Sequence, residues 1–282
     1  MSIRSWLIKA SIIVFLITVI FGGAAFFIYQ LFEAPKKMMQ HAMGEPTPTP
    51  PPDPSLAEFD RCMKTVKESA NLIDARKALE DFTTAYPDSP KIEQARDELG
   101  DINLKLFFSD APDPDKQQYT IQKGDTISAI ERKTKVPGEL IMRLNKIDDP
   151  TRLRIGTVLN VTKPQFALKI DHKSKRVVLT NNGKFFKQYK VSEWNAPVRK
   201  SSVPATTKVS DKSAWENNLR VPAGAKELTA SGHWIVTNVT GYTLYSEDVQ
   251  GVPKPEGGLG MDPDDMQELS TLINRGTPVT IE

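Results

Sequence analysis

The pattern of apolar and polar residues begins with one long, uninterrupted apolar segment. Ala10 to Tyr29 contains no charged residue and is almost wholly apolar. About 20 apolar residues are enough to cross the hydrocarbon core of a bilayer as a helix. Trp6 and Tyr29 lie where aromatic side chains favour the membrane interface. The pattern therefore predicts an uncleaved transmembrane anchor over residues 1–32. A cleaved signal peptide stays open as an alternative, because Gly22 to Ala25 is rich in small residues.

Two proline-rich segments predict linkers. Residues 33–54 end in the run EPTPTPPPDP, which can form neither a helix nor a central strand. Such a run favours an extended polyproline-type spacer of about 3.1 Å per residue. Residues 110–117 contain the acidic sequence DAPDPDK and are predicted to be a second linker. The folded parts of the chain are therefore expected between these segments and after the second one.

Residues 55–109 carry apolar residues at helical spacing. They recur in two runs, Leu72, Ala75, Leu79 and Phe82, and then Ile92, Ala95, Leu99 and Ile102. The text from Asp74 to Ile102 resembles tetratricopeptide helix pairs, in which a Tyr-Pro-Asp-Ser-Pro turn joins successive units. Only about one and a half units are present, and such units need stacked neighbours. We expect a small all-α region that is either a docking surface for a protein partner or a stiff spacer.

Residues 118–162 follow the order strand, turn, helix, turn, helix, strand. Asp125 or Thr126 is placed to cap the first helix, and a Pro137-Gly138 turn leads into the second. This βααβ order resembles the LysM domain, a module that binds N-acetylglucosamine-containing glycans. The positions that match are Tyr119, Gly124, Asp125, Thr126, Ile127, Ile130, Val136, Leu140, Asn145, Ile147, Leu153, Gly156 and Leu159.

The LysM resemblance implies a shallow sugar-binding groove between two loops. The implied contact residues are Gly124, Asp125, Thr126 and Ile127 after the first strand, and Ile147, Asp148 and Leu153 before the second. Backbone groups would hydrogen-bond the N-acetyl group while apolar side chains cover its methyl group, the usual mixture in a small-ligand site. The structural alternative is that Gly124 only makes the turn, Asp125 only caps and Asn145 only fixes a helix end.

Residues 166–282 show the alternating apolar pattern of strands. Asn182-Gly183 is a strong hairpin signal. Further on, Trp234 to Asn238 predicts a strand, Gly257 to Leu272 a Gly-rich turn and a helix, and Gly276 to Ile281 a closing strand. Gly241-Tyr242 and Gly276-Thr277-Pro278-Val279 resemble the end of the L,D-transpeptidase (YkuD-type) domain, which cross-links peptidoglycan through a cysteine. The resemblance implies a mainly-β fold with a few short helices.

The chemical positions of that family are substituted in this chain. Its His-Gly-Cys-Ile-Arg-Met element falls on Glu256 to Met261, so that the preceding His, the nucleophile and the Arg fall on Glu256, Gly258 and Gly260. A further family His falls on about Leu244. A thiolate nucleophile needs sulfur and a base that takes its proton. Neither lies at these positions, and we predict no catalytic residue among them.

Composition excludes several other kinds of site. The formal net charge of +2 gives no electrostatic case for a nucleic-acid partner. Cys62 is the one cysteine, which excludes an intrachain disulfide and a multi-thiolate metal site. The histidines lie in separate regions, so we expect neither a metal nor a cofactor. His233 is expected to be structural and His172, in a charged turn, to be solvated.

These observations predict a multidomain α+β protein of the bacterial cell envelope. A single-pass helix would anchor it in the cytoplasmic (inner) membrane, with the folded domains on the extracytoplasmic, wall-facing side. The LysM module would hold peptidoglycan glycan strands, and the transpeptidase-like domain would be a pseudoenzyme that serves as a scaffold or a stem-peptide pocket. Two alternatives stay open. One is an active L,D-transpeptidase-type enzyme with a non-standard nucleophile, in peptidoglycan cross-linking or remodelling. The other is a purely structural protein that acts through the helical region.

Overall fold

The computed structural model describes residues 3–33, 53–69, 71–109, 116–197, 205–221, 230 and 232–282. The chain divides into two compact units, Met1–Asp53 and Pro54–Glu282. Most of the predicted polyproline spacer and of the second predicted linker lies outside the described residues, so both stay predictions.

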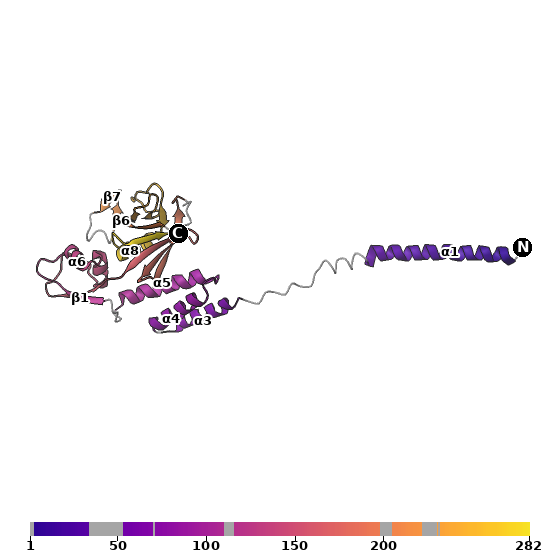
Figure 1. Cartoon of the computed structure of the whole chain (residues 1–282), viewed down its shortest axis with the longest axis horizontal. Helices are drawn as coiled ribbons and strands as arrows, with labels where there is room; N and C mark the ends of the chain where they lie inside the picture. The colour runs from indigo at the N-terminus through magenta and orange to yellow at the C-terminus, as the bar shows by residue number, and fades with distance from the viewer. Residues whose placement is uncertain are drawn as a thin grey trace. The chain divides into compact units, whose positions relative to one another are not determined.

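The first unit contains one long helix. α1 (Ile3–Ile28) continues into a π-helical turn, η1 (Tyr29–Glu33), and is drawn in indigo in Figure 1. Within these elements, Ala10–Phe32 forms a 23-residue span with a mean hydropathy of 2.6 and no part buried. This length and composition suffice to cross a membrane. A signal sequence near an N-terminus can have the same length and composition, so the alternative of a cleaved signal peptide stays open.

The second unit begins with the predicted helical region. It contains α3 (Pro54–Glu68), α4 (Leu72–Ala85) and α5 (Ile92–Phe108). Six of the eight periodic residues are buried, while Leu72 and Ile92 are half-buried. The buried cluster consists of Phe59, Cys62, Ala75, Leu79, Phe82, Ala95, Leu99 and Ile102. Burial, with the carboxylates of Glu58 and Asp81 nearby, raises the pKa of the Cys62 thiol to about 11. Cys62 is therefore a core residue, because a thiol with a raised pKa is a poor nucleophile near neutral pH.

The LysM module has the βααβ order that its sequence predicts. Its elements are β1 (Lys116–Thr120), α6 (Ile127–Thr134), α7 (Gly138–Leu144) and β2 (Val158–Thr162). β1 and β2 pair antiparallel, with Tyr119 opposite Leu159. Of the two candidate caps of α6, Thr126 is the one used, since its Oγ1 accepts from the backbone N–H of Ala129 at 3.1 Å.

The C-terminal region is a closed ring of strands. They are β3 (Phe166–Asp171), β4 (Arg176–Asn181), β5 (Lys184–Trp194), β6 (Ala205–Glu216), β7 (Leu219–Val221), β8 (Gly232–Thr237), β9 (Thr243–Ser246), β10 (Leu259–Met261) and β11 (Pro278–Ile281). The hydrogen-bonded order is β11-β3-β4-β5-β10-β9-β8-β6-β7, and β11 also pairs with β6, which closes the ring. α8 (Pro263–Leu272) packs against β8 and β9.

Most strand predictions in this region are confirmed, and one is incomplete. Asn182 and Gly183 join β4 to β5 with positive φ angles of 51° and 75°, as a two-residue hairpin requires. β8 and β11 cover the predicted strands near Trp234 and at the end of the chain. The predicted Gly-rich turn, however, contains β10, which lies between β5 and β9 in the sheet. A three-residue strand is too short to have a readable alternation.

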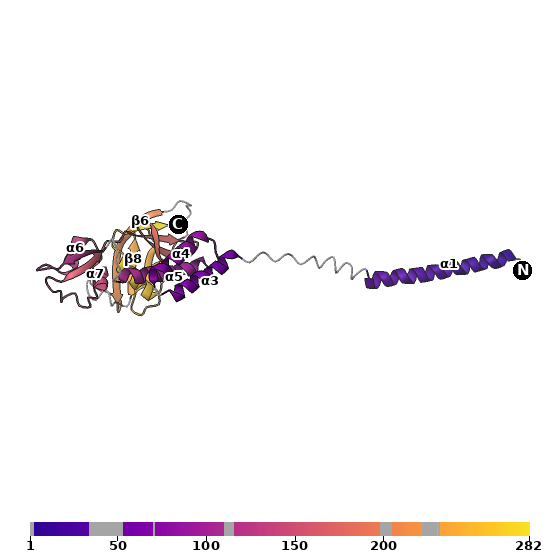
Figure 2. The same cartoon turned by 90° about the horizontal axis from the view of Figure 1, so that it is seen from below.

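The helical region, the LysM module and the strand ring share one hydrophobic core. Phe107 of α5 lies within ring contact of Phe166 of β3 and Phe186 of β5, with centroids 5.9 and 5.6 Å apart. The same buried cluster includes Ile121 and Ile141 of the LysM module. In Figures 1 and 2, α5 runs alongside the strands. α5 is therefore packed against its neighbours, and whether the helical region is a docking surface or a stiff spacer stays a prediction.

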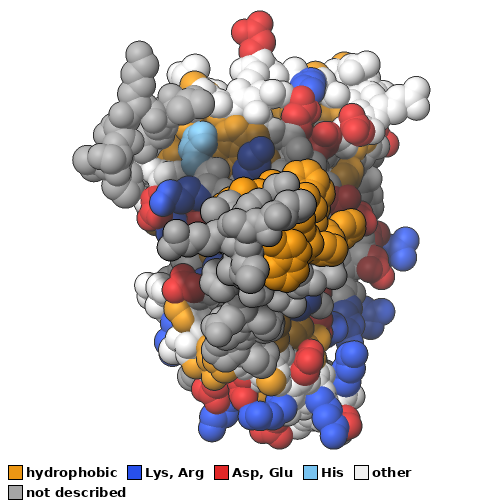
Figure 3. Space-filling view, turned by 90° about the vertical axis from the view of Figure 1, so that its right-hand side faces the viewer, with side chains coloured by type: hydrophobic (Ala, Val, Ile, Leu, Met, Phe, Trp, Pro, Cys, Tyr) orange, Lys and Arg blue, Asp and Glu red, His pale blue; other side chains and the backbone are white. Residues whose placement is uncertain are grey.

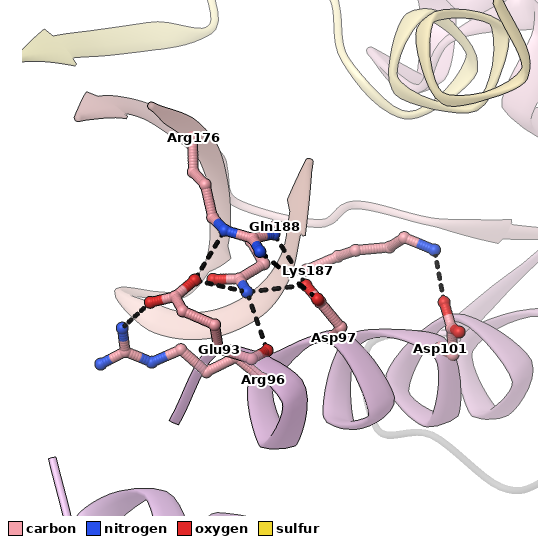
Figure 4. A network of polar contacts seen from close by, with 7 residues as sticks. All are labelled: Glu93, Arg96, Asp97, Asp101, Arg176, Lys187 and Gln188. Carbon is pink, nitrogen blue, oxygen red and sulfur yellow. Dashed lines mark hydrogen bonds and ion pairs between the residues drawn. The ribbon is translucent and has the colours of Figure 1, made fainter. Parts of the chain in front are cut away.

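A polar network adds to this contact, as Figure 4 shows. Arg176 of β4 pairs with Glu93 at 2.6 Å and with Asp97 at 2.9 Å, both on α5. Gln188 donates from Nε2 to Asp97 Oδ1 at 2.7 Å, and Lys187 pairs with Asp101 at 2.7 Å. Complementary charges on α5 and on the β4–β5 hairpin therefore fix the register of the helix on the sheet.

Charged side chains of both signs are interspersed over the face drawn in Figure 3. The sequence has 37 Lys and Arg residues against 35 Asp and Glu residues. Interspersed charges give no large field of one sign on this face. The expectation of no nucleic-acid partner stays a prediction.

Candidate functional site

The two predicted LysM loops meet at one cleft. It has a volume of about 1020 Å³, and its lining includes Asp125, Thr126 and Ile127 from the first loop and Leu153 from the second. The other three predicted contact residues, Gly124, Ile147 and Asp148, are not in its lining. The structure thus brings the first loop and the end of the second loop together. Contact of any of these residues with a glycan stays a prediction.

Asp125 holds the first loop in place. Its carboxylate accepts from Tyr119 Oη at 2.7 Å, from the backbone N–H of Gln122 at 2.8 Å and from Lys133 Nζ at 2.6 Å. The bond from Lys133, followed by the other two, lowers the pKa of Asp125 to about 2. The side chain of Asp125 is only 3% exposed. Its carboxylate therefore ties β1, the turn and α6 together instead of facing solvent.

Two sets of hydrogen bonds fix the second loop. Asn145 at the end of α7 donates to the carbonyl of Asn160 at 2.8 Å, and the N–H of Asn160 donates back to Asn145 Oδ1 at 2.7 Å. Asp149 accepts from the hydroxyl and the N–H of Thr151, which lowers its pKa. Asn145 therefore does fix a helix end, as the structural alternative has it, by joining α7 to β2.

The far wall of the cleft comes from the C-terminal region. It includes Lys212 of β6, Leu272 of α8, and Asn274, Arg275 and Thr277 of the loop between α8 and β11. Sequence reasoning missed these residues, because they come from segments far apart in the chain and match no motif. The cleft is therefore lined by the LysM module on one side and by the strand ring on the other.

A nearly buried ion pair joins these two walls. Lys212 Nζ lies 3.3 Å from Glu139 Oε2 of α7, and the two side chains are 11% and 12% exposed. Lys212 also donates to the carbonyl of Ile273 at 3.0 Å. Removing one partner of such a pair leaves a poorly solvated charge. The pair therefore favours one fixed arrangement of α7 against the end of α8.

The substituted transpeptidase positions lie together around β10. Gly258 has φ of +128°, and a Cβ there would collide with the carbonyl oxygen of Thr243. A Cβ on Gly260 would lie 3.0 Å from Glu193 Cβ and 3.1 Å from Tyr245 Oη. Leu244 is fully buried beside β10, and Glu256 is exposed. Neighbouring atoms thus fill the space that side chains at Gly258 and Gly260 would need.

A compact polar cluster occupies that space. Glu193 accepts from Tyr245 Oη at 2.8 Å, from Lys254 Nζ at 2.5 and 2.6 Å, and from Asn195 Nδ2 at 2.6 Å. The bond from Lys254 is the largest of the effects that lower the pKa of Glu193 to about 2. Burial, with Glu193 beside it, raises the pKa of Tyr245. Near neutral pH the phenol is protonated and the carboxylate is ionised and fully engaged, so neither is poised as a general base.

Of the three histidines in the sequence, the structure describes His172 and His233, which have different surroundings. His233 is 3% exposed on β8, and its backbone N–H donates to Ser246 Oγ at 2.9 Å. His172 is half-buried, its Nε2 lies 3.0 Å from Tyr242 Oη, and its ring packs on Trp194. The prediction that His172 is solvated holds only in part, because Trp194 of β5 and Tyr242, which precedes β9, cover one side of the ring. Among the residues that the structure describes, no group of His, Cys, Asp and Glu side chains could hold a metal ion.

Comparison with known proteins identifies the LysM module. The family model described as LysM domain matches residues 119–162. A curated relative, the chitin elicitor-binding protein of Oryza sativa subsp. japonica, is 44% identical over 46 residues, which cover 16% of this chain and 13% of that protein. The chain therefore spans only a small part of the length of this relative.

The structural neighbours of the chain are L,D-transpeptidases. An L,D-transpeptidase from Mycobacterium smegmatis is 11% identical and has a TM-score of 0.29, with 46% of this chain and 64% of that one covered. A cysteine-to-serine mutant of the Enterococcus faecium L,D-transpeptidase is 16% identical, also with a TM-score of 0.29, and is covered over 56% of its length. The chain thus carries a LysM domain over residues 119–162, followed by a mainly-β region whose neighbours are L,D-transpeptidases.

Proposed function

We propose that this protein is a membrane-anchored peptidoglycan-binding protein of the bacterial cell envelope. The LysM module holds N-acetylglucosamine-containing glycan. α1 is a single-pass anchor in the cytoplasmic membrane, and the folded unit faces the wall. The observation that carries the proposal is the LysM match over residues 119–162, together with the cleft on which both implied sugar-binding loops open.

The cleft has the composition of a sugar site. Ile127, Leu153 and Met142 give it apolar surface, while Thr126 and Thr151 add hydroxyl groups. Carbohydrate and other small-ligand sites combine apolar cover with a few fixed polar groups. The loops that carry these side chains are held by Asp125 and Asn145, so the site is formed before ligand arrives. Preformed loops reduce the entropy lost on binding.

The C-terminal region serves in this proposal as a non-enzymatic scaffold or stem-peptide pocket. Gly258 and Gly260 supply no nucleophile, and the space beside them is taken by Thr243, Glu193 and Tyr245. Glu193 is engaged by Lys254, and Tyr245 has a raised pKa. These features support a pseudoenzyme, since covalent catalysis needs an activated nucleophile with a base in reach.

Retention on insoluble peptidoglycan tests the binding function. The full-length chain in detergent is expected to sediment with purified peptidoglycan sacculi. Ser128→Trp, which places an indole on the cleft lining at an exposed position, is expected to abolish retention. Ser174→Trp is the matched control, because Ser174 is exposed in the β3–β4 turn and is not in the lining. Equal retention of both variants would mean that the cleft is not where the protein binds peptidoglycan.

Intact-mass spectrometry tests the pseudoenzyme part separately. The chain is incubated with peptidoglycan fragments and with a carbapenem, which acylates the cysteine of active L,D-transpeptidases. No covalent adduct and no cross-linked fragment are expected. A stable adduct on any residue would favour the alternative of an active enzyme with a non-standard nucleophile.

A further inference from the structure

We propose that the loop between α8 and β11 completes the glycan site that the LysM module begins. The cations that line the cleft then select a carboxylate-bearing glycan over a neutral one. The inference rests on the proposed function and names the ligand class of the same cleft. It starts from the far wall of the cleft, where Lys212, Asn274, Arg275 and Thr277 face the LysM loops.

The size of the cleft exceeds what one sugar ring needs. Pockets for whole drug-sized ligands have volumes of about 300–1,000 Å³, and this cleft has about 1020 Å³. The LysM loops line only one side of it. A ligand that contacts both walls would therefore be a chain of several sugars, or a sugar chain with a substituent that reaches across.

The two walls are held together as one site. The nearly buried pair between Lys212 and Glu139 and the bond from Lys212 to the carbonyl of Ile273 connect α7 with the end of α8. Just beyond, Thr277 Oγ1 accepts from the N–H of Asn274 at 3.0 Å, and the N–H of Thr277 donates to the carbonyl of Asn274 at 3.1 Å. These bonds fix the loop that carries Arg275, so the far wall is preformed.

The charges that remain available to a ligand in the cleft are positive. Its acidic side chains, Asp125, Glu131 and Glu139, all have partners already. Arg132 and Lys135 on the LysM side are exposed, and the structure as described gives neither an ion pair. Arg275 on the far wall pairs with Asp211 through Nη2, but its side chain is 66% exposed, and a guanidinium group has five N–H donors, which leaves some of them for a second carboxylate. The cleft thus offers cations from both walls to an anionic group between them.

The chemistry of these groups points to a carboxylate. A guanidinium group binds a carboxylate through two parallel hydrogen bonds, which fixes its orientation as well as its charge. The amide side chain of Asn274, half-buried beside Arg275, offers both a donor and an acceptor to hydroxyl or acetamido groups. A neutral N-acetylglucosamine oligomer would use the LysM loops and Asn274 but would leave Arg132 and Arg275 unused.

Isothermal titration calorimetry of the full-length chain in detergent tests this selectivity. Three ligands are compared: a neutral N-acetylglucosamine hexamer, peptide-free glycan strands that retain their muramic carboxylates, and the same strands with stem peptides. Arg275→Gln is expected to weaken binding of the acidic ligand about tenfold, since a hydrogen-bonded charge pair is lost. It should leave the affinity for the neutral hexamer within about twofold.

Arg220→Gln is the matched control. Arg220 contacts the same Asp211 at 2.7 Å, with a 51% exposed side chain, but it is not in the cleft lining. The control should change the affinity for no ligand, and both variants should unfold at the same temperature. Salt is expected to weaken acidic-ligand binding and not neutral-ligand binding, because it screens exposed charges.

The three ligands separate the outcomes. A stem peptide converts the muramic carboxylate into an amide, so a loss for the peptide-free strands alone places the carboxylate on the glycan. A loss for the peptide-bearing strands alone places it on the stem peptide, and a loss for both means that Arg275 accepts a carboxylate from either source; each of these results supports the inference. Equal affinity for neutral and acidic ligands, unchanged by Arg275→Gln, overturns the inference and leaves the proposed function intact. Binding of none of the three overturns the proposed function and the inference with it.

Discussion

The attachment of α5 to the strand ring is expected to depend on Phe107 more than on the charged network beside it. Phe107 is 7% exposed and lies in ring contact with Phe108, Phe166 and Phe186. Truncating a buried Phe to Ala removes its transfer free energy and leaves a cavity, which together cost about 3–5 kcal/mol. We therefore expect Phe107→Ala to lower the free energy of separating α5 from the sheet by about that amount.

The charged network is expected to contribute less than Phe107 to the free energy that holds α5 on the sheet, although it has more individual contacts. Arg176 is 17% exposed, but its partners Glu93 and Asp97 are 39% and 49% exposed and regain water when the arginine is removed. Exposed ion pairs contribute about 0–1 kcal/mol, and a partly buried pair somewhat more. Arg176→Gln is expected to cost about 1 kcal/mol.

Hydrogen exchange measured by mass spectrometry on the full-length chain distinguishes the two contributions. A loss of about 3 kcal/mol raises the opening equilibrium about 100-fold, so Phe107→Ala should accelerate exchange in α5 and β5 by about that factor. Phe108→Ala is the matched control, because Phe108 is only half-buried and packs under Arg143 at the rim. If Arg176→Gln accelerates exchange in α5 as much as Phe107→Ala does, the packing argument is refuted.

Three further perturbations have expected outcomes of their own. In a denaturant titration, Gly258→Ala should lower the free energy of unfolding by about 2 kcal/mol or more, because Gly258 has a positive φ and a Cβ there would collide with Thr243. Gly183→Ala is the comparison: Gly183 also has a positive φ but no atom near its Cβ, so the same titration should show a loss of only about 1 kcal/mol. Burial raises the pKa of Asp265 to about 6, so its ionisation as pH rises from about 4 to 6 lowers stability. Asp265→Asn should therefore gain up to about 1 kcal/mol at pH 7 and nothing below pH 4 in pH-dependent melting. Asp125, with its pKa lowered to about 2, contributes stability that is present above pH 4 and lost as pH falls towards 2; Asp125→Asn should abolish that part of the acid dependence.

Local patterns were sufficient for the elements whose residues carry their own signal. Asn182-Gly183 predicted the β4–β5 hairpin, because few residue pairs adopt two positive φ angles so easily. The run from Gly124 to Ile127 predicted the turn and the start of α6. The helix predicted after the Gly-rich turn is α8, which Asp262 caps by accepting at Oδ1 from the N–H of Asp264 at 2.9 Å.

Features that depend on distant contacts could not be predicted in this way. β10 is a strand only because β5 and β9 flank it, and its three residues carry no alternation. The partial cover over His172 comes from Trp194 at the end of β5 and from Tyr242 just before β9, both far from His172 in the sequence. Likewise, the LysM side of the cleft follows from one contiguous motif, while Lys212 and Arg275 line the cleft only because the ring packs against the module.

The shared core also decides how the function of each part is best tested. Removing residues 119–162 would delete Ile121 and Ile141 from the cluster that holds Phe107 and Phe166. The helical region and the strand ring would then expose apolar surface that the LysM module covers, and a loss of glycan binding would be confounded with a loss of folding. Point variants on the cleft lining avoid this, because Ser128 and Arg275 are exposed and lie outside the core. Because they share this core, the LysM module and the ring are expected to unfold together, so that a ligand bound across the cleft stabilises both. Saturating glycan should therefore slow exchange in α8 and β11 as well as in α6 and α7, whereas a ligand held by the LysM loops alone would protect only the latter pair.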